Sequence, residues 1–381
     1  MRILHIPNYY NPHIGGIEQV TEDIVDSLGD SYEQKIICFK DAKKTQVDVV
    51  NGIEVTRVGC QAKVASQSIA LKYKKELKKL INSFNPDIVF FHYPNPFVAS
   101  ALMPHLKNKK FKFILYWHLD ITKQKLLGKL FNGQTKKLLK FADKIVSTSP
   151  NYVMGSKSLK DNENKIMIIP SCVNDLKFEI NDDINNKVLK IKEENINKKI
   201  IFTCGRHVEY KGLTYLIEAS KSLPENYIVY IGGKGPLTDE LQNEAKDLSN
   251  VKFLGRLSED DLKAYTIACD VYAFPSITKN EAFGLALAEA LGYGKPAVTF
   301  TIDGSGVNYV NLNNVTGLEV KNGDSKAFAE ALIKISSDDE LNQKFSKNAK
   351  ERFNELFTFE KFKSSIIDLV KEVSYEKDSN L

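Results

Sequence analysis

The sequence predicts an α/β protein of two doubly wound domains, each built on a parallel β-sheet. Its length of 381 residues fits two domains of roughly 100 to 200 residues each. Short apolar runs alternate with amphipathic stretches along the whole chain. Each run is apolar throughout, which is typical of strands that are buried on both faces of a parallel sheet.

The apolar runs fall into two sets, one in each half of the chain. The first set lies at residues 3–7, 36–39, 88–91, 113–117, 145–148 and 166–170. The second set lies at residues 200–204, 227–232, 251–254, 271–274 and 297–300. Ligands of such folds bind at the carboxyl ends of the strands, and two facing sheets predict a cleft between those ends.

The stretch 174–198 separates the two sets and is rich in Asn, Lys and Asp, which indicates a linker that opens the second domain. We therefore expect an N-terminal domain over 1–173 and a C-terminal domain over 174–357. After Gly323 the sequence is helical in pattern, and Thr358 is placed to cap a last helix over about 358–381.

The composition indicates a globular protein, with 27 % charged and 43 % hydrophobic residues. The longest uncharged window, 88–106, is interrupted by prolines and fits a strand, a loop and the start of a helix. No signal-peptide pattern follows Met1. The five cysteines are far apart, which favours buried thiols in a reducing cytoplasm.

Positive charge is concentrated in the first half. Residues 1–175 carry a net charge of +10 and the remainder −5. Lysines crowd two segments, the second of which is interleaved with leucines: Lys72, Lys74, Lys75, Lys78 and Lys79, then Lys107 to Lys112, Lys123, Lys125, Lys129, Lys136, Lys137 and Lys140. Solvated helix faces are the commoner explanation, but the confinement to one domain favours an anionic membrane surface. No aromatic and basic pattern of a nucleic-acid-binding scaffold is present.

Gly15 and Gly16 follow the first predicted strand and precede an amphipathic helix. Adjacent glycines let the backbone approach a ligand and direct free amides at an anion near the helix N-terminus. An ordinary strand-to-helix turn has the same appearance.

A second turn combines Gly205 and Arg206 with Lys211, again between a strand and a helix. An arginine guanidinium, which donates two parallel hydrogen bonds, and a lysine ammonium can bind the same diphosphate. The alternative is that both side chains are solvated surface cations. The segment 232–236, which contains Gly233, is another glycine turn after a predicted strand. It either completes the diphosphate-binding pocket or has only the structural role of forming the turn.

Two carboxylates bracket the uncharged run 282–288. If Gly284 opens a helix, Glu281 lies in the preceding loop and Glu289 on the second turn of that helix. Two acids near one helix end suit the hydroxyl groups of a sugar or a ribose.

His118 and Asp120 come directly after a predicted strand of the first domain. A histidine at a sheet's carboxyl end can contact sugar hydroxyls or help to move a proton. The alternative is a structural histidine near the core, whose ring nitrogens form hydrogen bonds within the protein.

In this order along the chain, the motifs resemble the family 4 glycosyltransferases of the two-domain GT-B class, bacterial enzymes that use nucleotide-activated sugars. The resemblance spans nearly the whole chain. It depends on Gly15–Gly16, 117–120, Gly205–Arg206 with Lys211–Gly212, 274–276 leading to Glu281 and Glu289, and 294–298.

The resemblance implies that Arg206 and Lys211 hold the donor diphosphate and act on the leaving group, that Glu281 holds the transferred sugar and that His118 approaches its reacting carbon. These four residues are the expected catalytic set, with Asp120 as a secondary or acceptor residue. It also implies donor binding by Gly15, Gly16, Gly205, Gly233, Phe283, Gly284, Leu285 and Glu289, the last on the ribose. Such enzymes retain anomeric configuration, and no cofactor or metal is expected.

Two turns depart from the family's usual pattern. The sequence has 170–174 where a Pro-Asn-Gly-Val-Asp-like turn is common, and Lys234 where Gly-Asp-Gly-Pro is common. The first departure bears on the hinge between the domains. The second exchanges an acid for a base near the nucleotide.

The expected reaction is transfer of a hexose or deoxyhexose to a lipid-linked or membrane-proximal glycan acceptor, by an enzyme at the cytoplasmic face of the cell membrane. Residues 117–120 and 148–152 look similar to mannosyl- and rhamnosyltransferases of surface-polysaccharide synthesis, which favours mannose from GDP-mannose. A hydrolysing nucleotide-sugar epimerase of the same fold is the nearest alternative. A non-catalytic partner subunit is another, although the acidic pair and the Arg/Lys pair are both present.

Overall fold

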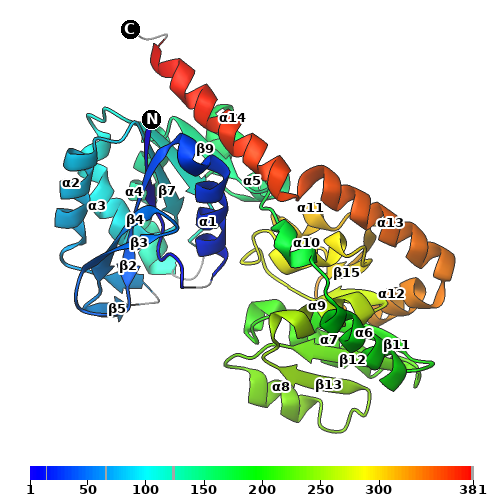
Figure 1. Cartoon of the computed structure of the whole chain (residues 1–381). Helices are drawn as coiled ribbons and strands as arrows, with labels where there is room; N and C mark the ends of the chain where they lie inside the picture. Colours follow the sequence, from blue (N-terminus) through cyan, green and yellow to red (C-terminus); the bar gives the residue numbers. More distant parts are fainter. Residues whose placement is uncertain (14, 65–66, 122–124, 379–381) are drawn as a thin grey trace. The chain divides into compact units, whose positions relative to one another are not determined.

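The computed structural model describes residues 1–13, 15–64, 67–121 and 125–378. The chain forms two compact units, each with its own sheet (Figure 1). The first unit contains Met1–Thr148, Ser156–Pro170 and Phe362–Leu381. The second contains Ser149–Gly155 and Ser171–Lys361.

The first unit is built on an eight-stranded sheet in the order β10-β9-β8-β7-β1-β2-β4-β3. Its neighbouring strands pair in parallel, except that β3 is antiparallel to β4. The strands are β1 (Arg2–Ile6), β2 (Glu33–Lys40), β3 (Gln46–Val50), β4 (Ile53–Gly59), β7 (Ile88–Tyr93), β8 (Lys112–Trp117), β9 (Lys144–Ser147) and β10 (Ile166–Ile168). Strand β5 (Ala62–Val64) pairs antiparallel with β6 (Gln67–Ile69) in a separate two-stranded sheet.

Helices flank this sheet, and α2, α3 and α4 lie side by side. The helices are α1 (Gly16–Leu28), α2 (Tyr73–Phe84), α3 (Pro96–Leu106) and α4 (Lys125–Phe141), with 3-10 turns at Gly29–Ser31 and Lys160–Lys165. In α2 the buried residues recur every three or four positions, which places one stripe against the sheet. Asn95 caps α3 by accepting a hydrogen bond from the Val98 amide at 3.0 Å.

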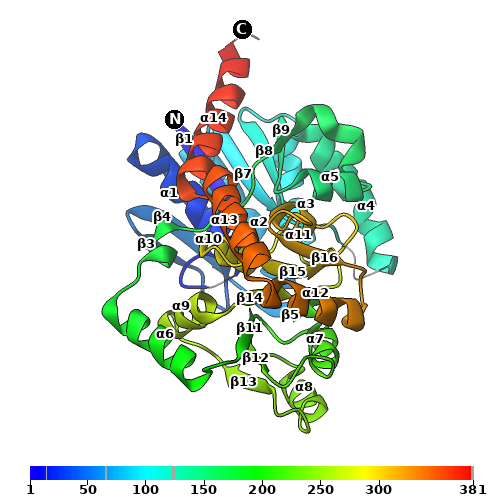
Figure 2. The same cartoon turned by 90° about the vertical axis from the view of Figure 1, so that its right-hand side faces the viewer.

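The second unit is built on a six-stranded parallel sheet in the order β13-β12-β11-β14-β15-β16, which can be followed in Figure 2. Its strands are β11 (Lys199–Cys204), β12 (Tyr227–Gly232), β13 (Val251–Gly255), β14 (Val271–Phe274), β15 (Ala297–Phe300) and β16 (Gly317–Val320). Every residue of β12, β14 and β15 is buried. This explains why their sequences are apolar throughout.

The helices of the second unit are mostly short. They are α5 (Pro150–Gly155), α6 (Asp182–Glu194), α7 (Leu213–Ser220), α8 (Thr238–Glu244), α9 (Glu259–Ala268), α10 (Leu285–Gly292), α11 (Val307–Val310), α12 (Ser325–Ser337) and α13 (Asp339–Leu356), with 3-10 turns at Asp175–Phe178 and Glu209–Lys211. The last helix, α14 (Phe359–Asp378), begins in this unit. The Lys361 amide donates to Thr358 Oγ1 at 3.4 Å, as expected of the predicted cap.

The prediction of a linker at 174–198 is wrong for most of that stretch. Helix α6 occupies its centre and packs against α9. Ile184, Val188 and Ile191 are buried at helical spacing, and the polar residues between them face solvent. The polar composition concealed a narrow apolar stripe.

Residues of α14 from Phe362 onward group with the first unit. Lys144 of β9 forms a salt bridge with Glu372, and Ser374 Oγ lies 3.4 Å from the Met1 sulfur. Within the described ranges, each helix is too short or too polar for a bilayer-crossing segment.

Candidate active site

Lys211 and Glu281 lie on neighbouring loops of the second unit, after the carboxyl ends of β11 and β14. The Lys211 ammonium donates to Glu281 Oε2, and Ser276 Oγ donates to the same oxygen at 3.1 Å. The ammonium also lies 5.1 Å from the centroid of the Phe274 ring, within cation–π range. The Lys211 and Glu281 side chains are 18 % and 13 % exposed, so the pair is largely removed from water.

Backbone contacts bring the two loops together. Gly212 has a φ of +61°, and a Cβ on it would lie 2.1 Å from the Pro275 carbonyl oxygen, so only glycine fits. The Ile277 amide donates to the Tyr210 carbonyl at 3.0 Å. On the other side, Ser305 Oγ donates to the Glu281 carbonyl oxygen. The predicted pair is therefore held from both sides.

The two predicted glycine turns of this unit are in direct contact. Gly233 has a φ of +105°, and a Cβ on it would lie 1.9 Å from the Gly205 carbonyl oxygen. Gly205 in turn lies beside Lys211, whose Nζ would be 3.9 Å from a Cβ at that position. Arg206 is exposed at the same turn and forms no ion pair with the described residues. The Arg206 guanidinium is thus open to an anion at one edge of the sheet, whereas the nearby Lys211 ammonium binds an anion only in exchange for Glu281.

Glu289 lies on the second turn of α10, as predicted, and Gly284 precedes the helix with a φ of +93°. The Oε1 atom of Glu289 is buried and has no hydrogen-bond partner among the described residues. Burial raises the pKa of the Glu289 carboxyl, and nearby Lys177 partly offsets this rise. A buried carboxylate oxygen without a partner is costly, and a hydroxyl donor would satisfy it.

The first turn of α10 follows directly on the loop that carries Glu281. Its leading amides, which include that of Leu285, have no carbonyl partner within the helix because they precede the first complete turn. Phe283 is buried and packs edge-on against Phe357 at 5.6 Å between ring centroids. The contact between Phe283 and Phe357 fixes the position of the backbone of this loop.

Gly15 and Gly16 open α1 in the first unit. The Gly15 backbone is extended, and its carbonyl accepts from the Gln19 amide at 2.9 Å. A Cβ on Gly16 would meet no atom within 4 Å, so the position has open space around it. The structure therefore leaves room beside a helix N-terminus, where an anion is favoured.

His118 follows β8 and is 8 % exposed. Its Nε2 lies 2.9 Å from Nδ1 of His92, which is fully buried at the end of β7. Burial lowers the pKa of His118 to about 3, so the ring is neutral at neutral pH. Of the two predicted roles, hydrogen bonding to a sugar hydroxyl fits this state better than proton transfer, which needs a pKa nearer the working pH.

Asp120 accepts hydrogen bonds from Trp117 Nε1 at 3.2 Å and from Ser156 Oγ at 2.8 Å. These bonds tie the segment after β8 to the segment after α5. The structure thus gives Asp120 a role in holding the chain around His118.

The sequence places residues 92–96 among the first-domain loops expected to recognise the acceptor, but it predicts no contact between His92 and His118 and gives no role to Ser305. A signal for the His92 contact was present, because His92 lies near the end of the strand next to the one that precedes His118. Parallel strands place their carboxyl ends at the same edge. Ser305 offered no such signal, since it reaches Glu281 from a loop 24 residues further along.

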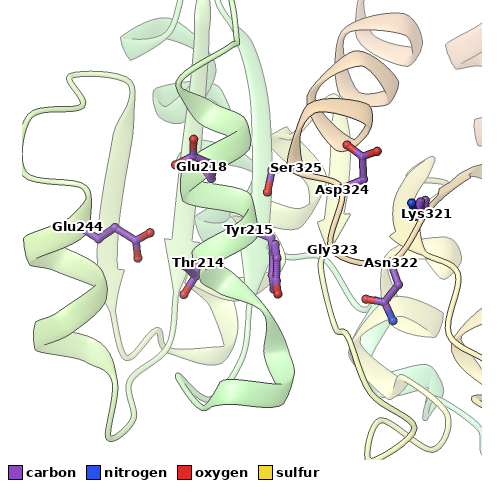
Figure 3. Close-up of a pocket in the computed structure, with 9 residues that line it drawn as sticks. All are labelled: Thr214, Tyr215, Glu218, Glu244, Lys321, Asn322, Gly323, Asp324 and Ser325. Carbon is purple, nitrogen blue, oxygen red and sulfur yellow. The ribbon is translucent and has the colours of Figure 1, made fainter.

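A hollow of about 520 Å³ lies between α7, α8 and the segment 321–325 (Figure 3). Glu218, Glu244 and Asp324 line it, together with Lys321. Three carboxylates repel a diphosphate, so this hollow does not suit a nucleotide-sugar donor.

The chain has two α/β units whose sheets are built mostly of parallel strands. Glycine turns, paired acids and cations lie at the strand ends. Together these features define a two-domain GT-B protein. The family model for "Glycosyl transferases group 1" matches residues 184–352, and the model for "Glycosyltransferase Family 4" matches residues 14–175. The chain belongs to the family 4 glycosyltransferases and is a glycosyltransferase. The predicted fold class and family are confirmed.

Relatives of known name resemble the chain over nearly its whole length. The O-antigen chain mannosyltransferase C of Escherichia coli is 30 % identical over 378 residues, which cover 97 % of this chain and 98 % of the relative. The D-rhamnosyltransferase WbpZ of Pseudomonas aeruginosa is 30 % identical over 366 residues, with 94 % and 92 % covered.

Solved structures share the fold. Sucrose-phosphate synthase from Thermosynechococcus elongatus superposes with a TM-score of 0.78 at 18 % identity, covering 98 % of this chain and 99 % of the other. HepE from Anabaena, solved in complex with UDP, gives 0.75 at 17 % identity, with 98 % and 100 % covered.

Proposed function

We propose that the protein transfers a hexose or deoxyhexose from a nucleotide-diphosphate sugar, with retention of anomeric configuration, to a lipid-linked or membrane-proximal glycan in surface-polysaccharide synthesis. Mannose from GDP-mannose is the first donor to test. The names of the Escherichia coli and Pseudomonas aeruginosa relatives support this class of sugar, and the name of the Escherichia coli relative supports this class of product. The observation that carries the proposal is the largely shielded Lys211–Glu281 pair. Beside it in the chain, helix α10 holds Glu289, whose buried Oε1 has no hydrogen-bond partner among the described residues.

In the proposed reaction the diphosphate of the donor takes the place of Glu281 as the partner of Lys211. Arg206, exposed at the neighbouring turn, adds a bidentate contact. Both cations would stabilise the negative charge that develops on the leaving nucleotide diphosphate. No metal is required in this scheme, which remains a prediction.

The exchange frees the Glu281 carboxylate for the hydroxyls of the transferred sugar. Glu289 would accept from the two ribose hydroxyls, which supplies the missing partner of its buried oxygen. A neutral His118 contributes a hydrogen bond to the sugar and no positive charge. Each carboxylate thus has a separate task, one on the sugar and one on the nucleotide.

For the acceptor, a hollow of about 450 Å³ lies at the carboxyl ends of β1 and β2 in the first unit. Tyr9 and His13 stack there with ring centroids 4.2 Å apart, and Asp41, Asp48 and Arg57 also line it. Aromatic faces beside carboxylates suit the apolar faces and hydroxyl edges of sugar rings. We assign the glycan part of the acceptor to this hollow.

Membrane contact, at the cytoplasmic face, would use the lysines of the first unit. Lys136, Lys137 and Lys140 on α4 are exposed, whereas the interleaved Leu138 and Leu139 are buried. The apolar side of this part of α4 therefore faces the domain core. Attraction to the membrane here would be electrostatic and sensitive to salt.

A donor panel tests the proposal directly. Binding of UDP-, GDP-, ADP- and dTDP-sugars is measured by thermal shift, and product formation is then followed with and without a lipid-linked glycan. Release of free sugar or its epimer without an acceptor would indicate the epimerase alternative. Lys211→Ala and Glu281→Ala should abolish transfer and keep the circular dichroism spectrum. Near-normal turnover by both variants would rule out the assignment.

A further inference from the structure

Two histidines of the first unit are joined by a direct hydrogen bond. His92 precedes the last residue of β7, and His118 follows β8, the parallel neighbour of β7. His92 Nδ1 lies 2.9 Å from His118 Nε2, and the ring planes are inclined by only 18°. Such a bond needs a proton on one of these nitrogens and a lone pair on the other.

Both rings are neutral near pH 7. Burial lowers the pKa of His118 to about 3 and lowers that of His92 well below its ordinary value, with His118 and His5 lowering the latter further. A neutral imidazole carries one N–H, so each ring has one donor and one acceptor nitrogen. The question is which nitrogen of each ring holds the proton.

Thr21 of α1 answers this for His92. The Thr21 hydroxyl donates to the Ile17 carbonyl at 2.8 Å, which uses its only proton. Its oxygen lies 3.4 Å from His92 Nε2 and 3.5 Å from Nδ1. The oxygen can therefore only accept from the ring. Because Nδ1 faces His118, the N–H that Thr21 accepts is the one on Nε2.

We propose that Thr21 and His92 are positioning residues that hold His118 in one tautomer, with its proton on Nε2 and a lone pair on Nδ1. His118 Nε2 then donates to His92 Nδ1. Within the described part of the chain, His118 Nδ1 has no hydrogen-bond partner. It is left as an acceptor for a ligand.

The identity of that ligand rests on the proposed function. An acceptor nitrogen recognises a hydroxyl group of the transferred sugar, which must donate to it. A sugar that lacks a hydroxyl at this place leaves the nitrogen unpaired, so the tautomer contributes to donor specificity. The opposite tautomer would instead favour an oxygen that only accepts.

Nitrogen-15 spectra of the histidine side chains test the tautomer. Long-range proton–nitrogen correlations separate protonated from bare ring nitrogens, and His118→Gln identifies the signals of His118. We expect a protonated Nε2 and a bare Nδ1 in the unliganded protein. A protonated Nδ1 would overturn the proposal. This readout needs no substrate, so it stands or fails independently of the proposed transferase activity.

Matched variants test the two positioning residues. His92→Asn keeps an acceptor near the place of Nδ1, whereas His92→Leu removes it; Thr21→Ser keeps the hydroxyl, whereas Thr21→Val removes it. The Leu and Val variants should populate both tautomers of His118 and lower kcat/KM about tenfold, the effect of one neutral hydrogen bond. The Asn and Ser variants should keep the wild-type spectrum.

A wild-type tautomer together with wild-type activity in the Leu and Val variants would contradict the proposal. Circular dichroism identifies any variant that fails to fold. Because Thr21→Val removes one buried oxygen and preserves side-chain volume, the Thr21 pair decides the question if His92→Leu does not fold.

Discussion

Lys211 and Glu281, 70 residues apart in the sequence, form a salt bridge that is largely shielded from water in the second unit. The cation also lies near the Phe274 ring, and Ser276 donates to the carboxylate. Both charges are therefore satisfied without a ligand. A donor diphosphate has to exchange for one of these contacts, so stability and activity depend on the same two residues.

The Lys211–Glu281 pair should show strong coupling in a double-mutant cycle. Lys211→Met and Glu281→Gln should each destabilise the protein by about 1–3 kcal/mol, because each leaves a shielded charge unpaired. The double variant should recover part of this loss, while all three variants lower kcat by about 100-fold or more. Urea unfolding and initial rates measure the two effects.

The exposed Lys187–Asp261 pair serves as the control for this cycle. Its side chains are 39 % and 40 % exposed, so solvent screens the attraction. A coupling at Lys211–Glu281 no larger than at Lys187–Asp261 would show that shielding adds nothing to the first pair.

Glu289 should make stability decrease as pH rises. Burial raises the pKa of its carboxyl above the ordinary value of 4.5, so the folded state holds the proton more tightly than the unfolded state. Stability is therefore lost between pH 4.5 and the raised pKa, and the loss is complete above it. Glu289→Gln should remove this slope and stabilise the free protein by about 1 kcal/mol at pH 7, while weakening donor binding about tenfold or more.

Urea unfolding of the wild type and Glu289→Gln at pH 5 and pH 8 checks the slope, and thermal shift with the preferred donor checks binding. Equal slopes in the two proteins would mean that the Glu289 carboxyl titrates normally. Unchanged donor affinity would remove Glu289 from the nucleotide site.

Alanine substitutions at Gly16 and Gly233 should distinguish a glycine needed for activity from a glycine needed for stability. Gly16→Ala places a methyl group in open space, so the free energy of unfolding should change by less than about 0.5 kcal/mol while kcat/KM falls about tenfold or more, since the backbone no longer approaches the anion. Gly233→Ala forces a φ of +105° and a clash with Gly205, and should cost about 1–3 kcal/mol. Paired unfolding and kinetic measurements of both variants decide this. A destabilised Gly16→Ala would point to a packing role.

The apolar pattern predicted strands such as β12, β14 and β15, which are buried throughout and need no polar positions. It missed β3, β4, β5, β6 and β16. Strand β4 is buried from Val55 onward, but its sequence includes Glu54 and Arg57 and is therefore not an apolar run. In β3, Val47 and Val49 are 60 % and 72 % exposed, so its apolar residues do not mark a core face. The short β16 follows polar turns, and its pairing with β15 is a property of the sheet that local sequence does not carry.

Motif order predicted the residues of the second unit's site because each motif is short and lies at a strand end. It could not predict contacts that join separate motifs. The hydrogen bond from Ser305 to the Glu281 backbone, and the contacts between Thr21, His92 and His118, arise from strand order and helix packing. The burial of Glu289 could likewise not be predicted from the sequence, because its neighbours come from several elements.

Charge reversal on α4 should weaken membrane binding through electrostatics alone. Each lysine near an anionic surface contributes about 1 kcal/mol, so reversing three should lower partitioning onto anionic vesicles about 100-fold or more. The buried Leu138 and Leu139 predict that high salt abolishes the remaining binding. Vesicle sedimentation compares Lys136→Glu, Lys137→Glu and Lys140→Glu combined with an equal reversal at the exposed Lys326, Lys334 and Lys344 of the second unit. Equal losses from both triple variants would show that net charge, and not this face of the first unit, controls binding.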